Sequence, residues 1–297
     1  MAHTGSVIKT FIGFMLCMLI GTSVIAHPGS GIVVDQYGQI YFTDTGKGVW
    51  KIDTNGKLTF LPASKFHWMT IDAVGSFAGS PKNFGEYFER VTPQNNKPAL
   101  IMCSDFPLVV GKDGNIYYAD TRPGSTKIIR RTPGGKESVL ARDKIFEFIS
   151  GIAVAADGSL YITETSDANA NTIRKITMNG TISVIATFVG KNGNDLPLET
   201  TPSYCRGLVV DSTGTIYVAA TGSRSVIKIS PGGIITNILQ EASPWTPTGV
   251  VVFHGELYVL EWHDVTEENL EVRSAYIPRV RKIGSDGKVT TIATVSR

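Results

Sequence analysis

Cysteine is scarce in this sequence. The 297 residues include 3 cysteines, namely Cys17, Cys103 and Cys205. Cys17 lies in an apolar N-terminal run, so the rest of the chain contains a single pair of cysteines. One pair cannot form the disulfide framework that holds many small secreted domains together, although one bridge is possible outside the cytoplasm. The fold must therefore depend on a packed core.

An excess of charge of one sign is also missing. The 28 Lys and Arg residues nearly balance the 26 Asp and Glu residues, which gives a net charge of +2. A nucleic-acid-binding protein needs a basic stripe, so we expect no nucleic-acid partner. The sequence also lacks a Gly-x-Ser-x-Gly elbow, a His-Glu-x-x-His helix and a phosphate-binding loop. The enzyme classes that depend on these motifs are not indicated.

Long hydrophobic runs are confined to the N-terminus. Lys9 is followed by the apolar run 11–21 and then by Val24-Ile25-Ala26. This pattern predicts a secretory signal peptide over residues 1–26, cleaved after Ala26. A retained membrane anchor is the alternative, but the run is short for a membrane span. We expect the mature chain, residues 27–297, to be a single secreted or periplasmic domain without membrane attachment.

One short phrase returns along the mature chain. Gly-x-apolar-Tyr occurs at 38–41, 114–117, 158–161, 214–217 and 255–258, and a worn copy at 67–78 fills the long first gap. Such a period, about 40 residues, indicates a repeat architecture.

Each repeat can be read as four strands separated by tight turns that end in glycine. An apolar inner strand is followed by the tyrosine-bearing strand, then by a strand of alternating apolar and basic residues, then by an apolar outer strand. In the worn copy, FERVT and ALIM are assigned to the third and fourth strands. Six such units predict an all-β fold, a six-bladed β-propeller of four-stranded antiparallel blades. Blade six should be complete without a strand borrowed from the N-terminus.

Two phrases resemble a known repeat family. GLVVDSTGTIYVAATGSRSVIKISPGG (207–233) and GIVVDQYGQIYFTDTGKGVWKIDTNG (31–56) are similar to NHL repeats. NHL propellers include protein-binding modules, RNA binders and a peptide-processing lyase. The gluconolactonase and senescence-marker families, which are metal-dependent hydrolases, resemble them in architecture. The resemblance therefore implies a fold and leaves the activity open.

The long connections are all predicted on one face of the propeller, opposite the tight turns. These segments are 78–89, 165–172, 190–204 and 264–278. Because elaborated loops on a rigid scaffold commonly carry function, we expect this to be the working face.

Two rings of residues are predicted at the mouth of the central channel on that face. The first ring precedes or begins the inner strands and consists of Ser30, His67, Phe106, Ser150, Arg206 and Thr248. The second ring ends the second strands and consists of Asp44, Asp120, Glu164, Ala220 and Glu261, with His263 just beyond.

The second ring offers candidate metal ligands, which are Asp44, Asp120, Glu164, Glu261 and His263. Converging carboxylates suit Ca²⁺, and histidine with carboxylates suits Zn²⁺. No cofactor is certain, and Ca or Zn is the candidate. The alternative is that acids such as Asp44 and Asp120 cap the neighbouring loops.

The first ring and its surroundings offer a ligand-binding set, which is His67, Arg206, Asp105, Tyr204 and Trp68. A buried guanidinium is costly without compensation, so Arg206 should pair with Asp105, Glu164 or a ligand anion. A packed channel histidine is the alternative for His67.

Three functions remain open. The first is a monomeric binding propeller for a small polar ligand, glycan or peptide. The second is a metal-dependent hydrolase or lyase of the gluconolactonase-like or NHL-lyase type, for which no catalytic residue can be named. The third is a protein-interaction scaffold for another extracytoplasmic protein. The mixed charges at the channel mouth favour the first, because a flat protein interface is usually rich in exposed aromatic residues.

Overall fold

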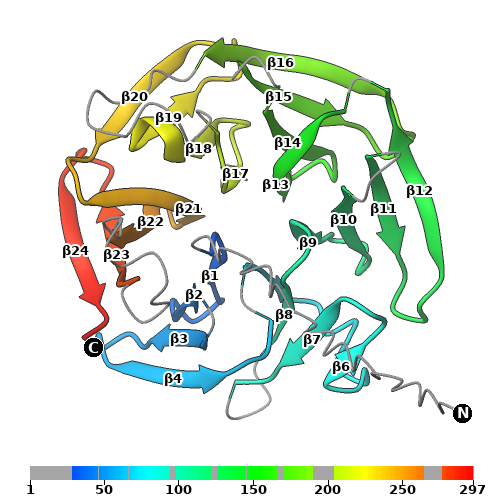
Figure 1. Ribbon diagram of the computed structural model, residues 1–297, viewed down its shortest axis with the longest axis horizontal. Helices are drawn as coiled ribbons and strands as arrows, with labels where there is room; N and C mark the ends of the chain where they lie inside the picture. The colour runs from blue at the N-terminus through cyan, green and yellow to red at the C-terminus, as the bar shows by residue number, and fades with distance from the viewer. Residues whose placement is uncertain are drawn as a thin grey trace, which may run out of the picture.

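Six four-stranded antiparallel sheets surround a central axis (Figure 1). The computed structural model describes residues 29–45, 47–65, 67–93, 98–121, 126–144, 146–165, 170–189, 204–263 and 276–296. The expected signal peptide lies outside these residues, as do 190–203 and 264–275 of the expected long loops. Within the described part, no helix has the length and apolarity needed to cross a membrane. The all-β six-bladed propeller expected from the repeats is confirmed.

Each sheet is one blade, with its first strand nearest the axis and its last strand on the perimeter in five of the six blades. Blade one contains β1 (Ile32–Val34), β2 (Ile40–Asp44), β3 (Gly48–Ile52) and β4 (Leu58–Pro62). Blade two contains β5 (Trp68–Asp72), β6 (Asn83–Phe84), β7 (Phe88–Val91) and β8 (Ala99–Cys103). Blade three contains β9 (Leu108–Val110), β10 (Ile116–Asp120), β11 (Lys127–Arg131) and β12 (Glu137–Arg142).

In the other three blades the strands run from the axis to the perimeter in chain order. Blade four contains β13 (Phe148–Val154), β14 (Leu160–Thr165), β15 (Ala170–Ile176) and β16 (Ile182–Val189). Blade five contains β17 (Leu208–Val210), β18 (Ile216–Ala220), the short 3₁₀ helix η1 (Thr221–Ser223), β19 (Ser225–Ile229) and β20 (Ile235–Gln240). Blade six contains β21 (Trp245–Phe253), β22 (Glu256–His263), β23 (Pro278–Ile283) and β24 (Val289–Thr294).

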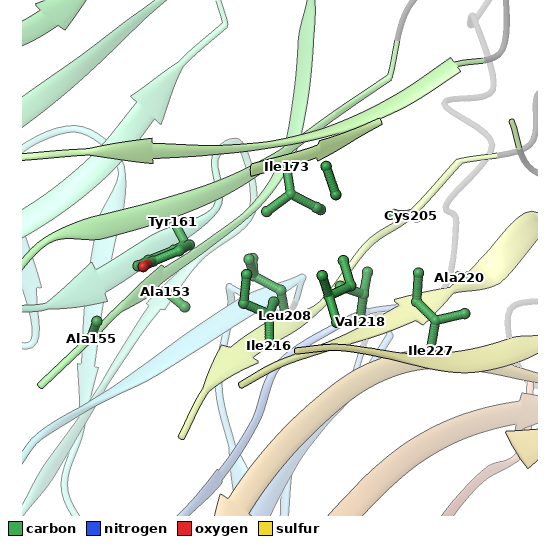
Figure 2. Close-up of a cluster of buried hydrophobic side chains, with 12 residues drawn as sticks. Ala153, Ala155, Tyr161, Ile173, Cys205, Leu208, Ile216, Val218, Ala220 and Ile227 are labelled. Atoms are coloured by element: carbon green, nitrogen blue, oxygen red, sulfur yellow. The ribbon is translucent and has the colours of Figure 1, made fainter. Parts of the chain in front are cut away.

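Apolar side chains fill every junction between neighbouring blades. Six buried clusters are present in the described chain, one for each junction of the ring. Figure 2 shows the cluster between blades four and five, where Tyr161 and Ile173 face Leu208 and Val218. The sheets therefore pack face to face, as a radial arrangement of half-buried blades requires.

The ring closes by packing of blade six against blade one. β1 pairs with β2, and β24 is the outer strand of blade six. Phe42 of blade one and Trp262 of blade six are both fully buried in the same cluster. The expected closure without a borrowed strand is confirmed.

Blade two differs from the expected order. Its strands run β5-β8-β7-β6 from the axis outward, so Ala99–Cys103 occupies the second position and not the fourth. All five of its residues are buried, as in β2 and β10. The outer strand of blade three, β12, is mostly exposed. The uninterrupted apolar run of β8 therefore suits the second position of a blade, where β2 and β10 are also buried throughout.

The order of blade two also changes which loops lie on which face. We call the face where the inner strands begin the ring face, and the opposite face the turn face. Because β5 ends on the turn face, the connection 73–82 crosses the sheet there, beside the blade-three turn that ends at Gly114. The expectation that 78–89 lies wholly on the ring face was wrong. Only the β6–β7 connection, 85–87, returns to it.

The recurring tyrosine has a structural explanation on the turn face. In five blades it lies opposite a basic residue of the third strand, in the pairs Tyr41–Lys51, Tyr117–Arg130, Tyr161–Lys175, Tyr217–Lys228 and Tyr258–Lys282. Nearby turn acids accept the hydroxyl protons. Tyr117 donates to Asp113 over 2.6 Å, and Tyr258 donates to Glu256 over 3.1 Å. Burial, aided by Asp113, raises the pKa of Tyr117 to about 12.

The Tyr117 hydroxyl provides a test of this motif. Replacing Tyr117 with phenylalanine leaves the ring packed and removes one hydrogen bond to a carboxylate, which should lower the free energy of unfolding by about 1–2 kcal/mol. Urea unfolding would measure the loss. Tyr37→Phe is the control, since Tyr37 is half exposed in a turn, and it should change the stability by less than about 0.5 kcal/mol. Equal effects of the two substitutions would contradict the assigned role.

Both cysteines of the described chain are free and buried. Burial raises the pKa of Cys103 to about 11 and also raises the pKa of the Cys205 thiol. Since the thiolate is the reactive form, neither thiol should react quickly in the folded protein. We predict that a disulfide reagent such as DTNB titrates both only after unfolding in guanidinium. Fast reaction of either in native buffer would contradict the burial.

Candidate functional site

The residues that begin the inner strands meet at one end of the axis. We call Ser30, His67, Phe106, Ser150, Arg206 and Thr248 the axial ring. Hydrogen bonds join its members across four blade junctions. Thr248 Oγ1 donates to Gly29 O (2.8 Å) and Ser30 N to His67 O (2.8 Å). Ser150 Oγ donates to Cys205 O (2.5 Å) and Gly207 N to Thr248 O (3.0 Å).

Glycines allow the inner strands to approach this closely. A Cβ on Gly249 would lie 2.4 Å from the carbonyl oxygen of Ser30 in the next blade. A Cβ on Gly207 would lie 2.7 Å from the Gly249 Cα. Backbones of blades five, six and one are therefore in direct contact around the axis, and only glycine fits at these two positions.

Three members of the axial ring have a structural role. Ser150 and Thr248 lie at the irregularities between β13 and β14 and between β21 and β22. Each hydroxyl donates to a backbone carbonyl of the next blade, Cys205 O and Gly29 O respectively. Phe106 packs in the core between blades two and three against Tyr87 and Tyr118. Ser30, His67 and Arg206 remain as the polar candidates of the ring.

His67 is held in a defined orientation. Its Nδ1 lies 2.7 Å from Ser104 O, and because a carbonyl only accepts, Nδ1 carries the proton. In the neutral ring Nε2 is then an acceptor, which is the form that binds a donor or a metal. Trp68 packs edge-on against the imidazole at 5.4 Å. The two aromatic residues of the expected site are thus neighbours.

A buried carboxylate holds the segment before His67. Glu89 of β7 is fully buried, and its Oε2 accepts from the N–H groups of Ser64 and Lys65 and from Ser64 Oγ. Although burial opposes ionisation, these hydrogen bonds hold the pKa of Glu89 below its usual value. Glu89 therefore fixes the connection that delivers His67 to the axis. Sequence analysis did not identify it, although an acid in a strand of the worn repeat was a visible signal.

Arg206 is a buried cation of the axial ring. It is 7% exposed, and its guanidinium lies over the Tyr204 ring at 5.0 Å with a hydrogen bond to the Tyr204 hydroxyl (3.4 Å). Blade five has Ala220 at the end of its second strand, where four other blades have an acid.

Of the two acids proposed as partners of Arg206, one is exposed and the other is bonded to other donors. Asp105 is exposed after β8, and its backbone N–H contacts Cys103 Sγ at 3.4 Å. The Glu164 carboxylate accepts from Arg174 (2.6 Å) and from the Glu147 N–H (2.5 Å). The expected pairing of Arg206 with Asp105 or Glu164 stays a prediction. The third option, a ligand anion, stays a prediction.

The candidate metal ligands do not assemble. Asp44 accepts from the Trp50 indole (2.9 Å), Asp120 pairs with Lys127 (3.3 Å), and Glu261 pairs with Arg279. His263 packs edge-on against Trp245 at 5.3 Å. Among the described residues no group of three or more His, Cys, Asp or Glu side chains could hold a metal ion. Asp44, Asp120 and Glu261 each bond to a donor of their own blade, and within the described residues the candidate Ca or Zn ligands do not form such a group.

The Glu261 pair belongs to a larger charged network between blades five and six. Arg279 also donates to Glu241 (2.8 Å) and lies over the Trp245 ring at 3.8 Å, and Arg281 donates to Glu241 (2.6 Å). Burial raises the pKa of Glu261 to about 7 in spite of Arg279. The network ties the end of blade five to blade six, which is a structural role.

These features define a six-bladed β-propeller whose axial ring combines a buried arginine, an oriented histidine and a serine. No protein-family model matches the chain, so the NHL resemblance stays a prediction. Human teneurin-4 is 27% identical over 241 residues, which cover 72% of this chain and 8% of that protein. Chicken teneurin-1 is 27% identical over 245 residues, with the same coverage. The chain thus spans less than a tenth of these curated relatives.

Solved structures share the fold at low identity. Virginiamycin B lyase from Staphylococcus aureus is 17% identical with a TM-score of 0.51, covering 91% of this chain and 85% of that one. A luciferin-regenerating enzyme is 17% identical with a TM-score of 0.56, covering 91% and 93%. At these identities the likeness is one of fold alone, since one fold hosts many activities.

Proposed function

We propose that this protein is a binding propeller that holds a small polar ligand, glycan or peptide at the axial ring. The observation that carries the proposal is the position of two polar side chains at the axial ring, namely the buried Arg206 from blade five and the oriented His67 from blade two. His67, fixed through Nδ1, adds a polar group from blade two.

Several observations support the axial ring over other surfaces. The ring is rigid, because backbone hydrogen bonds and glycine contacts join the inner strands that deliver its side chains. Sites on rigid elements bind with little ordering cost. Two of the fold neighbours are named as enzymes, a lyase and a luciferin-regenerating enzyme. Turnover of a small molecule at the same ring is therefore the second candidate function.

The test is binding by the double variant His67→Ala/Arg206→Ala. Calorimetry of the mature protein against small sugars, sugar acids and short peptides should identify a ligand. Loss of two polar contacts, one of them charged, should weaken that ligand at least about a hundredfold. The circular dichroism spectrum and the unfolding temperature should show that the fold is intact. Unchanged affinity would contradict the site, and absence of any ligand would favour a plain scaffold propeller.

We also propose that the protein acts outside the cytoplasm, in the periplasm or the extracellular medium. The support is the signal-peptide pattern of residues 1–26. Expression of the full chain in a secreting host should give a mature protein that begins at His27. N-terminal sequencing and intact mass would show this. A cytoplasmic protein with the intact N-terminus would contradict the proposal.

A further inference from the structure

The outer strand of blade four is an unprotected sheet edge. β16 is the last strand of its sheet, so within the described chain it pairs with β15 alone, and it lies on the perimeter of the propeller (Figure 1). Its eight residues, ISVIATFV, include neither a charge nor a proline. An edge of this kind presents a row of backbone N–H and C=O groups to any strand that approaches it.

Other edges of the propeller have features that hinder such pairing. β6 has only two residues, β4 ends at Pro62, and β12 contains Glu137 and Arg142. Short edges, prolines and charges are common protections against edge-to-edge association. The outer strands of blades five and six, β20 and β24, are uncharged but have six residues each. The edge of blade four is therefore the longest of the six, and it lacks these three protections.

Exposed apolar side chains gather beside this edge. Five of the nine large apolar side chains that are exposed in the described chain lie on the outer strands of blades three to five or in the turns just before them. These five, which we call the apolar band, are Val139 (48% exposed), Met178 (41%), Val184 (55%), Ile234 (70%) and Ile235 (39%). Met178 lies in the turn before β16, and Ile234 lies in the turn before β20.

The apolar band continues across the borders between these blades. A Cβ on Gly180 would lie 2.6 Å from Leu140 O, so the turn before β16 lies against β12. A Cβ on Gly233 would lie 3.7 Å from Ile185 O, so the turn before β20 lies against β16. Exposed apolar residues therefore flank the edge of blade four on both sides. A continuous apolar patch of this kind marks an interaction surface.

The lack of charge favours a second copy of this chain as the partner. When a strand pairs antiparallel with its own copy about a twofold axis, any charge on it is brought close to the same charge on the partner. Like charges across a strand pair are destabilising, and β16 carries none. The apolar band is uncharged as well, so it offers nothing that would select a different chain by opposite charge.

We propose that two copies of this chain pair antiparallel through β16, so that the two blades four form one continuous sheet and the two apolar bands meet. At about 3.4 Å per residue, the strand is about 27 Å long. The contact uses the same surface of both copies, so it closes at two. Because it lies on the perimeter, both axial rings stay open on the ring face, and the inference does not depend on the proposed function.

Sedimentation velocity of the mature protein tests the proposal. Between about 1 and about 200 µM we expect a shift from monomer to dimer as the concentration rises. Val184→Lys places a charge in the middle of the edge on each copy and should weaken dimerisation at least about tenfold. Val74→Lys is the matched control, because Val74 is 60% exposed in the connection after β5 of blade two, and it should leave dimerisation unchanged.

Two further measurements locate the contact. Amide hydrogen exchange of residues 182–189 should be slower in the dimer than in the monomer, and Val184→Lys should abolish that difference. Ile234→Lys changes a residue of the apolar band in a turn, where it is 70% exposed, and should weaken dimerisation about threefold or more. Circular dichroism would show that each variant keeps the fold.

Three results would overturn the proposal. The first is a monomer at every concentration, as the sequence predicted. The second is a dimer that Val184→Lys and Ile234→Lys leave as tight as that of the parent, which would place the contact on another surface. The third is growth beyond two copies, because an isologous contact at a single edge cannot extend.

Discussion

Replacing Gly249 with alanine should destabilise the propeller more than any other single methyl addition at an inner strand of blades five and six. The new Cβ would lie 2.4 Å from the backbone oxygen of Ser30, and a backbone atom cannot move aside as a side-chain end can. Overpacking of this kind costs about 3 kcal/mol. For a domain of this size that corresponds to a drop in unfolding temperature of about 8 °C. Differential scanning calorimetry would measure it.

The control for this prediction is Gly79→Ala. No atom lies within 4 Å of the Cβ that would be added at Gly79. The substitution should therefore change the free energy of unfolding by less than about 0.5 kcal/mol. If Gly249→Ala is as well tolerated as Gly79→Ala, then blades six and one are not in the backbone contact described above, and the closure of the ring would need another explanation.

The second large effect is a pH dependence of stability that originates at Glu261. Burial raises the pKa of this carboxyl to about 7 in the folded protein. In the unfolded chain it should titrate near about 4.3. Between those pH values the folded protein holds a proton that the unfolded chain has released. The contribution of Glu261 to the free energy of unfolding therefore falls as the pH rises through this window, by about 3 kcal/mol in all.

Glu261→Gln removes this titration and keeps a carbonyl oxygen for Arg279. The stability of the variant relative to the parent should therefore increase by about 3 kcal/mol between pH 4.5 and about pH 8. Urea unfolding at several pH values would measure the difference. Glu256→Gln is the opposite case, because the ion pair with Lys282 lowers the pKa of Glu256, and its parent loses stability as the pH falls. If the stability difference between Glu261→Gln and the parent did not change with pH, Glu261 would be ionised throughout this range.

The repeat predicted most of the fold because its residues have separate physical tasks. The glycine and the acid make the turn, the tyrosine donates to that acid, and the basic residue lies opposite the tyrosine, as in Asp113, Tyr117 and Arg130. Blade two lacks this phrase, so its order was read by analogy and was wrong. The signal for the true order was present in Ala99–Cys103, which is apolar at every position, as a strand buried on both faces should be.

The candidate site was predicted only in part, because position in a repeat does not reveal what a side chain bonds to. Asp120 and Glu261 were correctly placed at strand ends, but each lies opposite a basic residue of the third strand, Lys127 and Arg279. The alternating basic residues of those strands were a signal of this pairing. Ser30 gave no such signal, since its difference from Ser150 depends on how blade two approaches blade one.

The central claim is that the axial ring binds a ligand, and a crystal structure of the mature protein with its tightest ligand tests it most directly. The account predicts ligand atoms within about 3.2 Å of the polar side chains of His67 or Arg206, on the ring face. A ligand seated on the turn face or on the perimeter strands would contradict it.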